Sequence, residues 1–351
     1  MSAAAAYGLD EVKPMLQQRA LDLAIELAPG GRREGAYYVA PNPARGSDRI
    51  GSFKVFLSGP AAGGFEEFDA GGTEKGSIFD LIIYAGRARD ISGALAWAKA
   101  WLGLDTASPG VLKQRYKTAA AVKVRQDDDA MKRAAFTRKA ARALWQSGEA
   151  IEMGGPVAVY LRNRGIRFAR LVELKAIRQV RGLEYQDGNR RIGPYPVMVA
   201  AMQDPAGDIC AVHRTYLRPD ASAKADVPAP KKMLGPKAGA VIRVWPGDGD
   251  PGVTLTEGIE DALTIAQADP ARRVWAVGDL GNLAAFMPPD GRTLERVTVV
   301  ADNDWNNPGA QRALDKALIA LAGRFGSVHV ARSPVGKDFN DFLTQEETSN
   351  A

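Results

Sequence analysis

Cysteine and histidine are scarce in this sequence: Cys210 is the only cysteine, and His213 and His329 are the only histidines. A single thiol excludes an intrachain disulfide, and so few ligands exclude a zinc site of the Cys/His type. No run of about 20 consecutive apolar residues occurs, which argues against a membrane-spanning helix. The first residues also lack the basic start and apolar run of a secretory signal. We therefore expect a cytoplasmic protein without zinc.

The composition is that of a globular protein with an uneven distribution of charge. The chain has 351 residues, of which 46% are hydrophobic and 25% charged, and this length suits two or three modules. Residues 251–351 contain 9 Lys and Arg against 14 Asp and Glu, whereas residues 1–250 contain 37 against 27. A basic first part and an acidic last part indicate that one binds a polyanion and the other binds cations.

The pattern of apolar residues changes near residue 252. Before it, short strand-like pieces over 37–70, helical periodicity over 10–28 and a hairpin over 197–217 predict mixed α+β structure. After it, strands alternate with helices, which predicts a small, mostly parallel sheet with helices on its faces. Asn307 and Pro308 are a typical helix start, so the segment VTVVADND before them is a strand followed by a loop.

Acidic residues follow three of these predicted strands. The clusters are Glu257 with Glu260 and Asp261, Asp302 with Asp304, and Asp338 with Asp341. Because parallel strands share a direction, their carboxyl ends lie at one edge of the sheet and the three loops converge there. Such carboxylates repel one another unless a cation lies among them, and Mg²⁺ (or Mn²⁺) suits hard oxygen ligands and phosphate substrates. One aspartate after a strand is usually a turn or cap residue, so the prediction depends on all three clusters.

The segments TEGIEDAL, VVADNDWNNPG and GKDFNDFL resemble the three acidic motifs of the Toprim domain, which primases, topoisomerases and some nucleases share. The resemblance implies that Glu257 is a catalytic general acid/base and that Asp302 and Asp304 bind metal and take part in catalysis. Asp261 and Asp338 match further acidic positions of the primase version. Many primases carry another acid where Asn340 stands here, and Asp341 is adjacent to it. The implied metal ligands are Glu257, Asp261, Asp302, Asp304, Asp338 and Asp341.

The segment before these motifs resembles the catalytic core of bacterial and phage primases. The hairpin is followed by PKKMLGP, with Arg214 at the family arginine and Lys231 at the family lysine. The resemblance implies that Arg214, Lys231, Lys232 and the Lys337 of the last acidic motif bind nucleotide or DNA, since guanidinium and ammonium groups pair well with phosphates. A solvated basic loop is the alternative for PKKMLGP.

The segments NPARGSDRIGSFKVFL (42–57) and GGFEEFDAGGTEKGSIFDLIIYAG (63–86) resemble the zinc ribbon of bacterial primases with its ligands replaced. Ala40-Pro41-Asn42-Pro43 stands at the first ligand pair and Phe68-Asp69-Ala70-Gly71 at the second, so this version must be held together by its apolar core. The aromatic residues of this part of the chain are expected mainly in that core. Its candidate contacts to a nucleic-acid backbone are Arg45, Arg49 and Lys54.

We expect a multi-domain α/β protein with a Rossmann-like Toprim sheet. The expected parts are a cysteine-less zinc-ribbon-like domain (1–106), a linker (107–126), a basic primase-like subdomain (127–250) and the Toprim domain (251–347). The expected activity is RNA primer synthesis from NTPs on single-stranded DNA, for a phage, plasmid or other mobile element. No Walker A motif is present, so a replicative helicase is expected as a separate partner. The alternatives are a Toprim-type nuclease and a non-catalytic single-strand-binding accessory protein.

Overall fold

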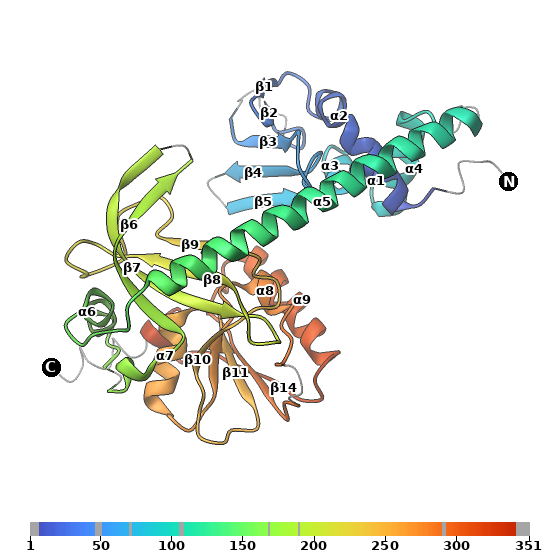
Figure 1. Cartoon of the computed structure of the whole chain (residues 1–351). Coiled ribbons are helices and arrows are strands. Elements are labelled where there is room, and N and C mark those ends of the chain that lie inside the picture. The colour runs from blue at the N-terminus through green and yellow to red at the C-terminus, as the bar shows by residue number, and fades with distance from the viewer. Residues whose placement is uncertain are drawn as a thin grey trace. The chain divides into compact units, whose positions relative to one another are not determined.

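The computed structural model describes residues 7–45, 51–69, 72–104, 109–167, 169–188, 190–289 and 293–341. The chain divides into two compact units, Met1–Lys132 and Arg133–Ala351. Helix α5 (Pro109–Ser147) runs through this boundary, and from Pro109 onward the segment expected as a linker is part of it (Figure 1). Within the described ranges, no helix is long and apolar enough to cross a membrane.

In its described residues the first unit contains an antiparallel sheet and four helices that precede α5. Its strands are hydrogen-bonded in chain order: β1 (Arg32–Glu34), β2 (Tyr37–Ala40), β3 (Phe53–Phe56), β4 (Phe65–Asp69) and β5 (Gly72–Gly76). The helices are α1 (Leu9–Gln18), α2 (Ala20–Leu27), α3 (Ile78–Tyr84) and α4 (Ile91–Trp101). The single helix predicted over 10–28 is wrong in one respect: it is broken at Arg19, whose backbone leaves the helical region and whose guanidinium lies 4.3 Å from the centre of the Trp101 ring.

Aromatic rings form the centre of this unit. Phe53, Phe65 and Tyr84 pack against one another, with ring centres 5.4 Å (Phe53–Phe65), 5.7 Å (Phe53–Tyr84) and 4.6 Å (Phe65–Tyr84) apart. The loop over 40–43 is held by Asn42, which is buried, donates to the Tyr84 hydroxyl at 2.8 Å and accepts from the Ala44 amide at 2.8 Å. An apolar core and a buried asparagine thus hold this part of the domain in place.

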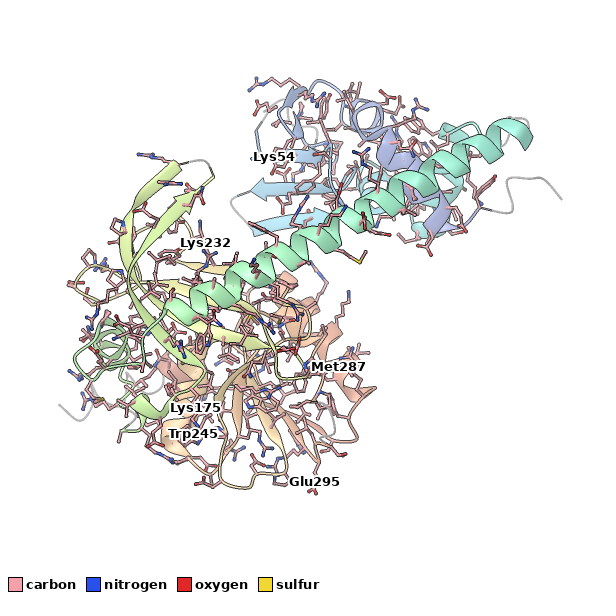
Figure 2. All side chains as sticks on the ribbon, viewed as in Figure 1. Lys54, Lys175, Lys232, Trp245, Met287 and Glu295 are labelled. Carbon is pink, nitrogen blue, oxygen red and sulfur yellow. The ribbon has the colours of Figure 1, made fainter. Side chains whose placement is uncertain are left out.

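The candidate DNA-contacting residues of the first unit lie in different settings. Lys54 is half-buried on β3, between β2 and β4 (Figure 2), and Arg45 is exposed in the turn after Asn42. Arg49 lies outside the described residues. Their contact with nucleic acid stays a prediction.

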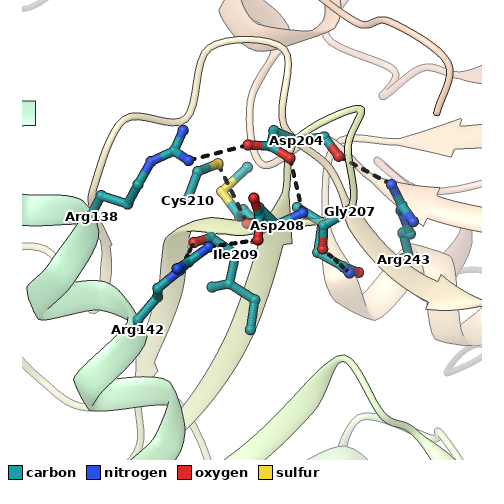
Figure 3. Close-up of polar contacts among 10 residues, drawn as sticks. Arg138, Arg142, Asp204, Gly207, Asp208, Ile209, Cys210 and Arg243 are labelled. Carbon is teal, nitrogen blue, oxygen red and sulfur yellow. Dashed lines mark hydrogen bonds and ion pairs between the residues drawn. The ribbon is translucent and has the colours of Figure 1, made fainter. Parts of the chain in front are cut away.

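The first sheet of the second unit is antiparallel, with its strands in the order β6-β7-β8-β9. The strands are β6 (Ile177–Asp187), β7 (Arg190–Gln203), β8 (Ile209–Tyr216) and β9 (Lys231–Leu234), and the hairpin predicted over 197–217 is confirmed as β7–β8. The short helices α6 (Pro156–Asn163) and Leu171–Glu173 precede the sheet. Figure 3 shows how the turn of this hairpin binds α5: Arg138 pairs with Asp204 at 3.3 Å, and Arg142 pairs with Asp208 at 2.6 Å.

A second sheet follows in the order β10-β12-β11-β13-β14. The strands are β10 (Ile242–Trp245), β11 (Val253–Thr256), β12 (Val274–Ala276), β13 (Val297–Val300) and β14 (Val328–Ala331). All are parallel to their neighbours except β10, which runs antiparallel to β12. The predicted mostly parallel α/β sheet is confirmed, and the chain as a whole is a multi-domain α/β protein.

Helices cover both faces of this sheet. Helix α7 (Ile259–Ala268) shares one apolar cluster with β10 and β12, while α8 (Leu280–Leu283) and α9 (Pro308–Ala322) share another with β11 and β13. Asn307 caps α9 by accepting a hydrogen bond from the Ala310 amide at 3.1 Å, as predicted. With both faces covered, only the strand ends and the loops that follow them are open to a ligand.

Candidate functional site

The register of the parallel strands brings the acidic loops to one edge of the sheet. Thr256 pairs with Val300, and Val300 pairs with Ala331, so β11, β13 and β14 end side by side. Glu257 follows β11 directly and Asp302 lies two residues beyond β13. The predicted convergence of the acidic loops therefore follows from strand pairing alone.

A cavity of about 270 Å³ lies at this edge. Its acidic lining residues are Glu257, Glu260, Asp261, Asp302 and Asp338, and its basic and imidazole residues are Arg164, His213, Lys224, Lys231 and Lys337. Glu257, Asp302 and Asp338 come from loops that follow strands of the parallel sheet, and Glu260 and Asp261 come from the first turn of α7. His213 and Lys231 come from β8 and β9. We call Glu257, Asp261, Asp302 and Asp338 the acidic wall and Arg164, His213, Lys224 and Lys231 the basic wall; both line this one cavity.

The carboxylates of the acidic wall destabilise one another's charge. Burial and the nearby Asp302 raise the pKa of Glu257 to about 7. Burial together with Asp338 and Asp302 raises the pKa of Asp261 to about 7 as well. A bound cation would relieve this repulsion.

Lys337 places an ammonium group between the two aspartates of the central motif. Its Nζ lies 3.5 Å from Asp302 Oδ2 and 3.5 Å from Asp304 Oδ1. The intervening Asn303 fastens the loops together, since its amide donates to the Lys337 carbonyl at 2.7 Å and its side chain donates to Ser333 and Gly336 carbonyls at 2.9 and 3.0 Å. The two carboxylates therefore already share one positive charge.

Among the described residues, no group of three or more His, Cys, Asp or Glu side chains is arranged to hold a metal ion. Mg²⁺ commonly binds proteins through one or two carboxylates and completes its shell with water and substrate phosphates, so a three-carboxylate cage is not required. Asp302 and Asp304 fit that requirement, because they are partly exposed oxygen donors that already hold a cation.

Glu260, a member of the first acidic cluster of the sequence, is a buried carboxylate that organises the basic wall. Glu260 is 5% exposed; Tyr160 donates its hydroxyl to Glu260 Oε1 at 2.7 Å, and Lys224 Nζ lies 2.9 Å from the same oxygen. Lys231 Nζ lies 4.0 Å from Oε2. Burial acts to raise the pKa of Glu260, but Lys231, Lys224 and the Tyr160 hydrogen bond outweigh it and lower the pKa. The sequence places Glu260 in the first acidic cluster, and only the fold brings Tyr160 and Lys224 to it.

Comparison with known protein families identifies the part of the chain that carries the acidic wall. The model described as "Toprim domain" matches residues 253–349, which contain all the acidic motifs. The chain carries a Toprim domain. A second model, described as a domain of unknown function (DUF7146), matches residues 135–244, the part that supplies α6 and β6–β9. No curated protein matches the chain significantly.

Several solved structures that resemble the chain are primases. A primase of Aquifex aeolicus comprising zinc-binding and RNA polymerase domains has a TM-score of 0.40 and 15% identity over 100% of this chain and 85% of that one. The DnaG catalytic core has a TM-score of 0.44 and 12% identity, covering 61% and 78%. The primase fragment of the bacteriophage T7 primase-helicase has a TM-score of 0.31 and 20% identity, covering 45% and 62%. Because each TM-score is below 0.5, function has to be argued from the Toprim match and from the site.

Several predicted site residues lie outside the cavity lining. Asp341 accepts the Lys337 amide at 3.0 Å and so shapes the last loop of the Toprim domain. Arg214 donates to the Met233 carbonyl at 3.0 Å, and Lys232 lies 4.1 Å from the centre of the Tyr185 ring. These contacts show structural roles, and their contact with metal or nucleotide stays a prediction.

Asn340, at the position where many primases have an acid, is fully buried. Its amide donates to Asp261 Oδ1 at 3.2 Å, and its side chain donates to the Arg164 carbonyl at 2.7 Å. It therefore joins the acidic wall to the basic wall without adding charge.

His213 is a buried neutral group on the basic wall. It is 6% exposed, and its Nδ1 lies 3.4 Å from Thr215 Oγ1. Burial lowers its pKa to about 4; Lys231, Lys224 and Arg214 also lower it, against an opposing effect of Glu260. The folded protein therefore keeps this ring neutral at pH values where an unfolded chain protonates it.

This difference predicts a loss of stability on acidification. Below the unfolded pKa of about 6.5, the unfolded state binds a proton that the folded state binds only near pH 4, so the free energy of unfolding falls as pH falls. Between pH 7 and pH 4.5 the contribution of His213 is about 2 to 3 kcal/mol. Urea unfolding of the wild type and His213→Gln checks it: the variant should lose that much less stability over this range. If both proteins lost the same free energy of unfolding between pH 7 and pH 4.5, His213 would not be the source of the acid sensitivity.

Proposed function

We propose that this protein is a primase-type nucleotidyltransferase that makes short RNA primers on single-stranded DNA. The observation that carries the proposal is the cavity in which Toprim carboxylates face the lysines and arginine of the preceding subdomain. A triphosphate needs cations around it, and a hydroxyl nucleophile needs a proton acceptor. Both kinds of group line one cavity here.

The basic wall is suited to hold the triphosphate. Lys224 and Lys231 reach the cavity, and Glu260 keeps both oriented. The Arg164 Nε is buried and has no hydrogen-bond partner within the described part of the chain, so this donor is available for a phosphate oxygen. These residues bind and orient the incoming nucleotide.

The acidic wall is suited to activate the nucleophile. A carboxylate with a pKa of about 7, as at Glu257, can accept the proton of an attacking 3′ hydroxyl near neutral pH. Asp302 and Asp304 are the residues proposed to hold Mg²⁺ or Mn²⁺, with Asp261 and Asp338 beside them. The bound metal supplies neutralisation of the charge that develops on the phosphates.

The remaining parts of the proposal concern partners and setting. The first unit, with Lys54 and Arg45, is proposed to contact the template, and a separate helicase is proposed to load the protein. The proposed setting is the cytoplasm of a cell that carries a phage, plasmid or other mobile element.

Incubation with single-stranded DNA, radiolabelled NTPs and Mg²⁺ or Mn²⁺ tests the proposed activity. Labelled oligoribonucleotides that require both template and metal are the expected product. Shortened template without labelled product would instead identify a nuclease. Binding of the template without either product would identify a non-catalytic accessory protein.

A further inference from the structure

A second cavity lies in the Toprim-containing unit, away from the carboxylates. It is a groove of about 1030 Å³, and its lining includes Trp145, Trp245 and Trp275 together with Arg170, Arg178 and Arg243. We call it the tryptophan–arginine groove. Small-molecule sites typically enclose about 300 to 1,000 Å³, so this groove is large enough for a ligand of nucleotide size or greater.

Strand register places the groove at the opposite edge of the sheet from the catalytic cavity. Trp245 pairs with Val274, the first residue of β12, whereas Ile242 pairs with Ala276, the last. Thr256, which immediately precedes Glu257, also pairs with Ala276. The two cavities therefore lie at opposite ends of the same strands, and the groove is a separate site.

The groove presents guanidinium groups stacked on buried tryptophans. The Cζ atoms of Arg170 and Arg178 lie 4.5 Å from the ring centres of Trp245 and Trp145, respectively. Trp245 is 2% exposed and Trp145 is 8% exposed, so their rings serve as rigid supports and the arginines form the surface. Stacked guanidinium planes are surfaces on which nucleic-acid bases stack.

The lining is also strongly positive. It contains five cationic side chains (Arg170, Lys175, Arg178, Arg243 and Arg273) and one carboxylate, Glu173, which pairs with Arg170 at 2.6 Å. Arg178 donates to the Trp145 and Gly148 carbonyls at 3.0 and 3.3 Å, which fixes the guanidinium without neutralising it. Lys175 is exposed at the groove beside Trp245 (Figure 2). Positive charge of this kind attracts phosphate.

We propose that the tryptophan–arginine groove is a second nucleotide-binding site, in which Lys175 and Arg178 bind phosphate and the guanidinium of Arg170 carries a base. The ligand is a nucleotide, either free or as one unit of a single strand. Apolar residues along the same lining, among them Val172 and Ile209, suit a ligand that has a flat apolar part as well as a phosphate. The site does not depend on the catalytic proposal.

The test uses the full chain in metal-free buffer with two probes, ATP and a fluorescein-labelled twelve-nucleotide oligo-dT. The charge-reversed variant is Arg170→Glu/Lys175→Glu, and the matched control is Lys316→Glu, an exposed lysine of α9. Anisotropy and calorimetry measure affinity, and hydrogen exchange measures which peptides the probe protects. Thermal melting confirms that both variants are folded.

The proposal predicts that a probe slows exchange of peptides over 171–178 and 242–247, and that the charge-reversed variant loses this protection. Its affinity for that probe should fall at least about tenfold. For the oligonucleotide, loss of the Lys175 phosphate contact should reduce the slope of log K against log salt by about 0.7. If the charge-reversed variant loses affinity for both ATP and oligo-dT, the site binds a single nucleotide unit. If it loses affinity for oligo-dT alone, the site binds a strand. No protection, or affinities equal to those of Lys316→Glu, would overturn the proposal.

Discussion

Replacing Glu257 by Gln is expected to lower primer synthesis at least about 100-fold while leaving the fold and template binding intact. The substitution keeps the shape of the side chain but removes the carboxylate, whose raised pKa of about 7 suits proton transfer at neutral pH. It also removes the repulsion with Asp302, so the free protein should be no less stable. Initial rates of labelled-NTP incorporation, measured with saturating template and Mg²⁺, check the expectation.

The matched control is Glu295→Gln. Glu295 is exposed and immediately precedes Arg296 and β13, at the sheet edge opposite to the carboxylates (Figure 2). The rate of primer synthesis by the Glu295→Gln variant should stay within about twofold of the wild-type rate, as expected for a surface substitution. A Glu257→Gln enzyme that retains the wild-type rate would remove Glu257 from catalysis.

Replacing Glu260 by Gln is expected to destabilise the second unit by about 3 kcal/mol. The carboxylate is buried against Lys224 and Lys231, and its removal leaves two ammonium groups with one neutral amide between them. Removing one partner of a buried ion pair typically costs about 3 to 5 kcal/mol, and the partial exposure of Lys224 places this case at the low end. Urea unfolding followed by tryptophan fluorescence measures the loss.

An exposed ion pair provides the comparison. Arg218 and Asp226 are 2.9 Å apart with Asp226 76% exposed, so Asp226→Asn should leave the free energy of unfolding almost unchanged. Adding Lys224→Met to Glu260→Gln should recover part of the loss, because one uncompensated charge is then gone. If Glu260→Gln were no more damaging than Asp226→Asn, Glu260 would not be the organiser of the basic wall.

The acidic wall could be predicted from the sequence because it follows from strand direction. β-branched runs that end in Glu257 and Asp302 reach one edge once the sheet is parallel, and no side-chain detail is needed. Asp302 and Asp304 share Lys337 as expected of a cation-binding pair, while Asn303 between them fixes the loop. In the segment Asp302-Asn303-Asp304, the two aspartates therefore supply the negative charge and the asparagine between them holds the loop in place.

The basic wall and the groove could not be predicted in the same way. Tyr160 and Glu260 are 100 residues apart and meet only when α6 packs beside α7. Trp145, Trp245 and Trp275 look like ordinary core residues in the sequence, and their arginine partners come from other segments. Single charged or aromatic residues without periodicity carry no signal until tertiary packing brings them together.

The central claim is that the Toprim carboxylates hold a divalent cation for nucleotidyl transfer, and an anomalous difference map from Mn²⁺-soaked crystals tests it most directly. We expect a peak bound by Asp302 and Asp304, with Lys337 displaced from between them and Glu257 beside the ion. The peak should be absent from crystals of Asp302→Asn soaked in the same way. A map without manganese at this edge, with Lys337 still between the two aspartates, would contradict the account.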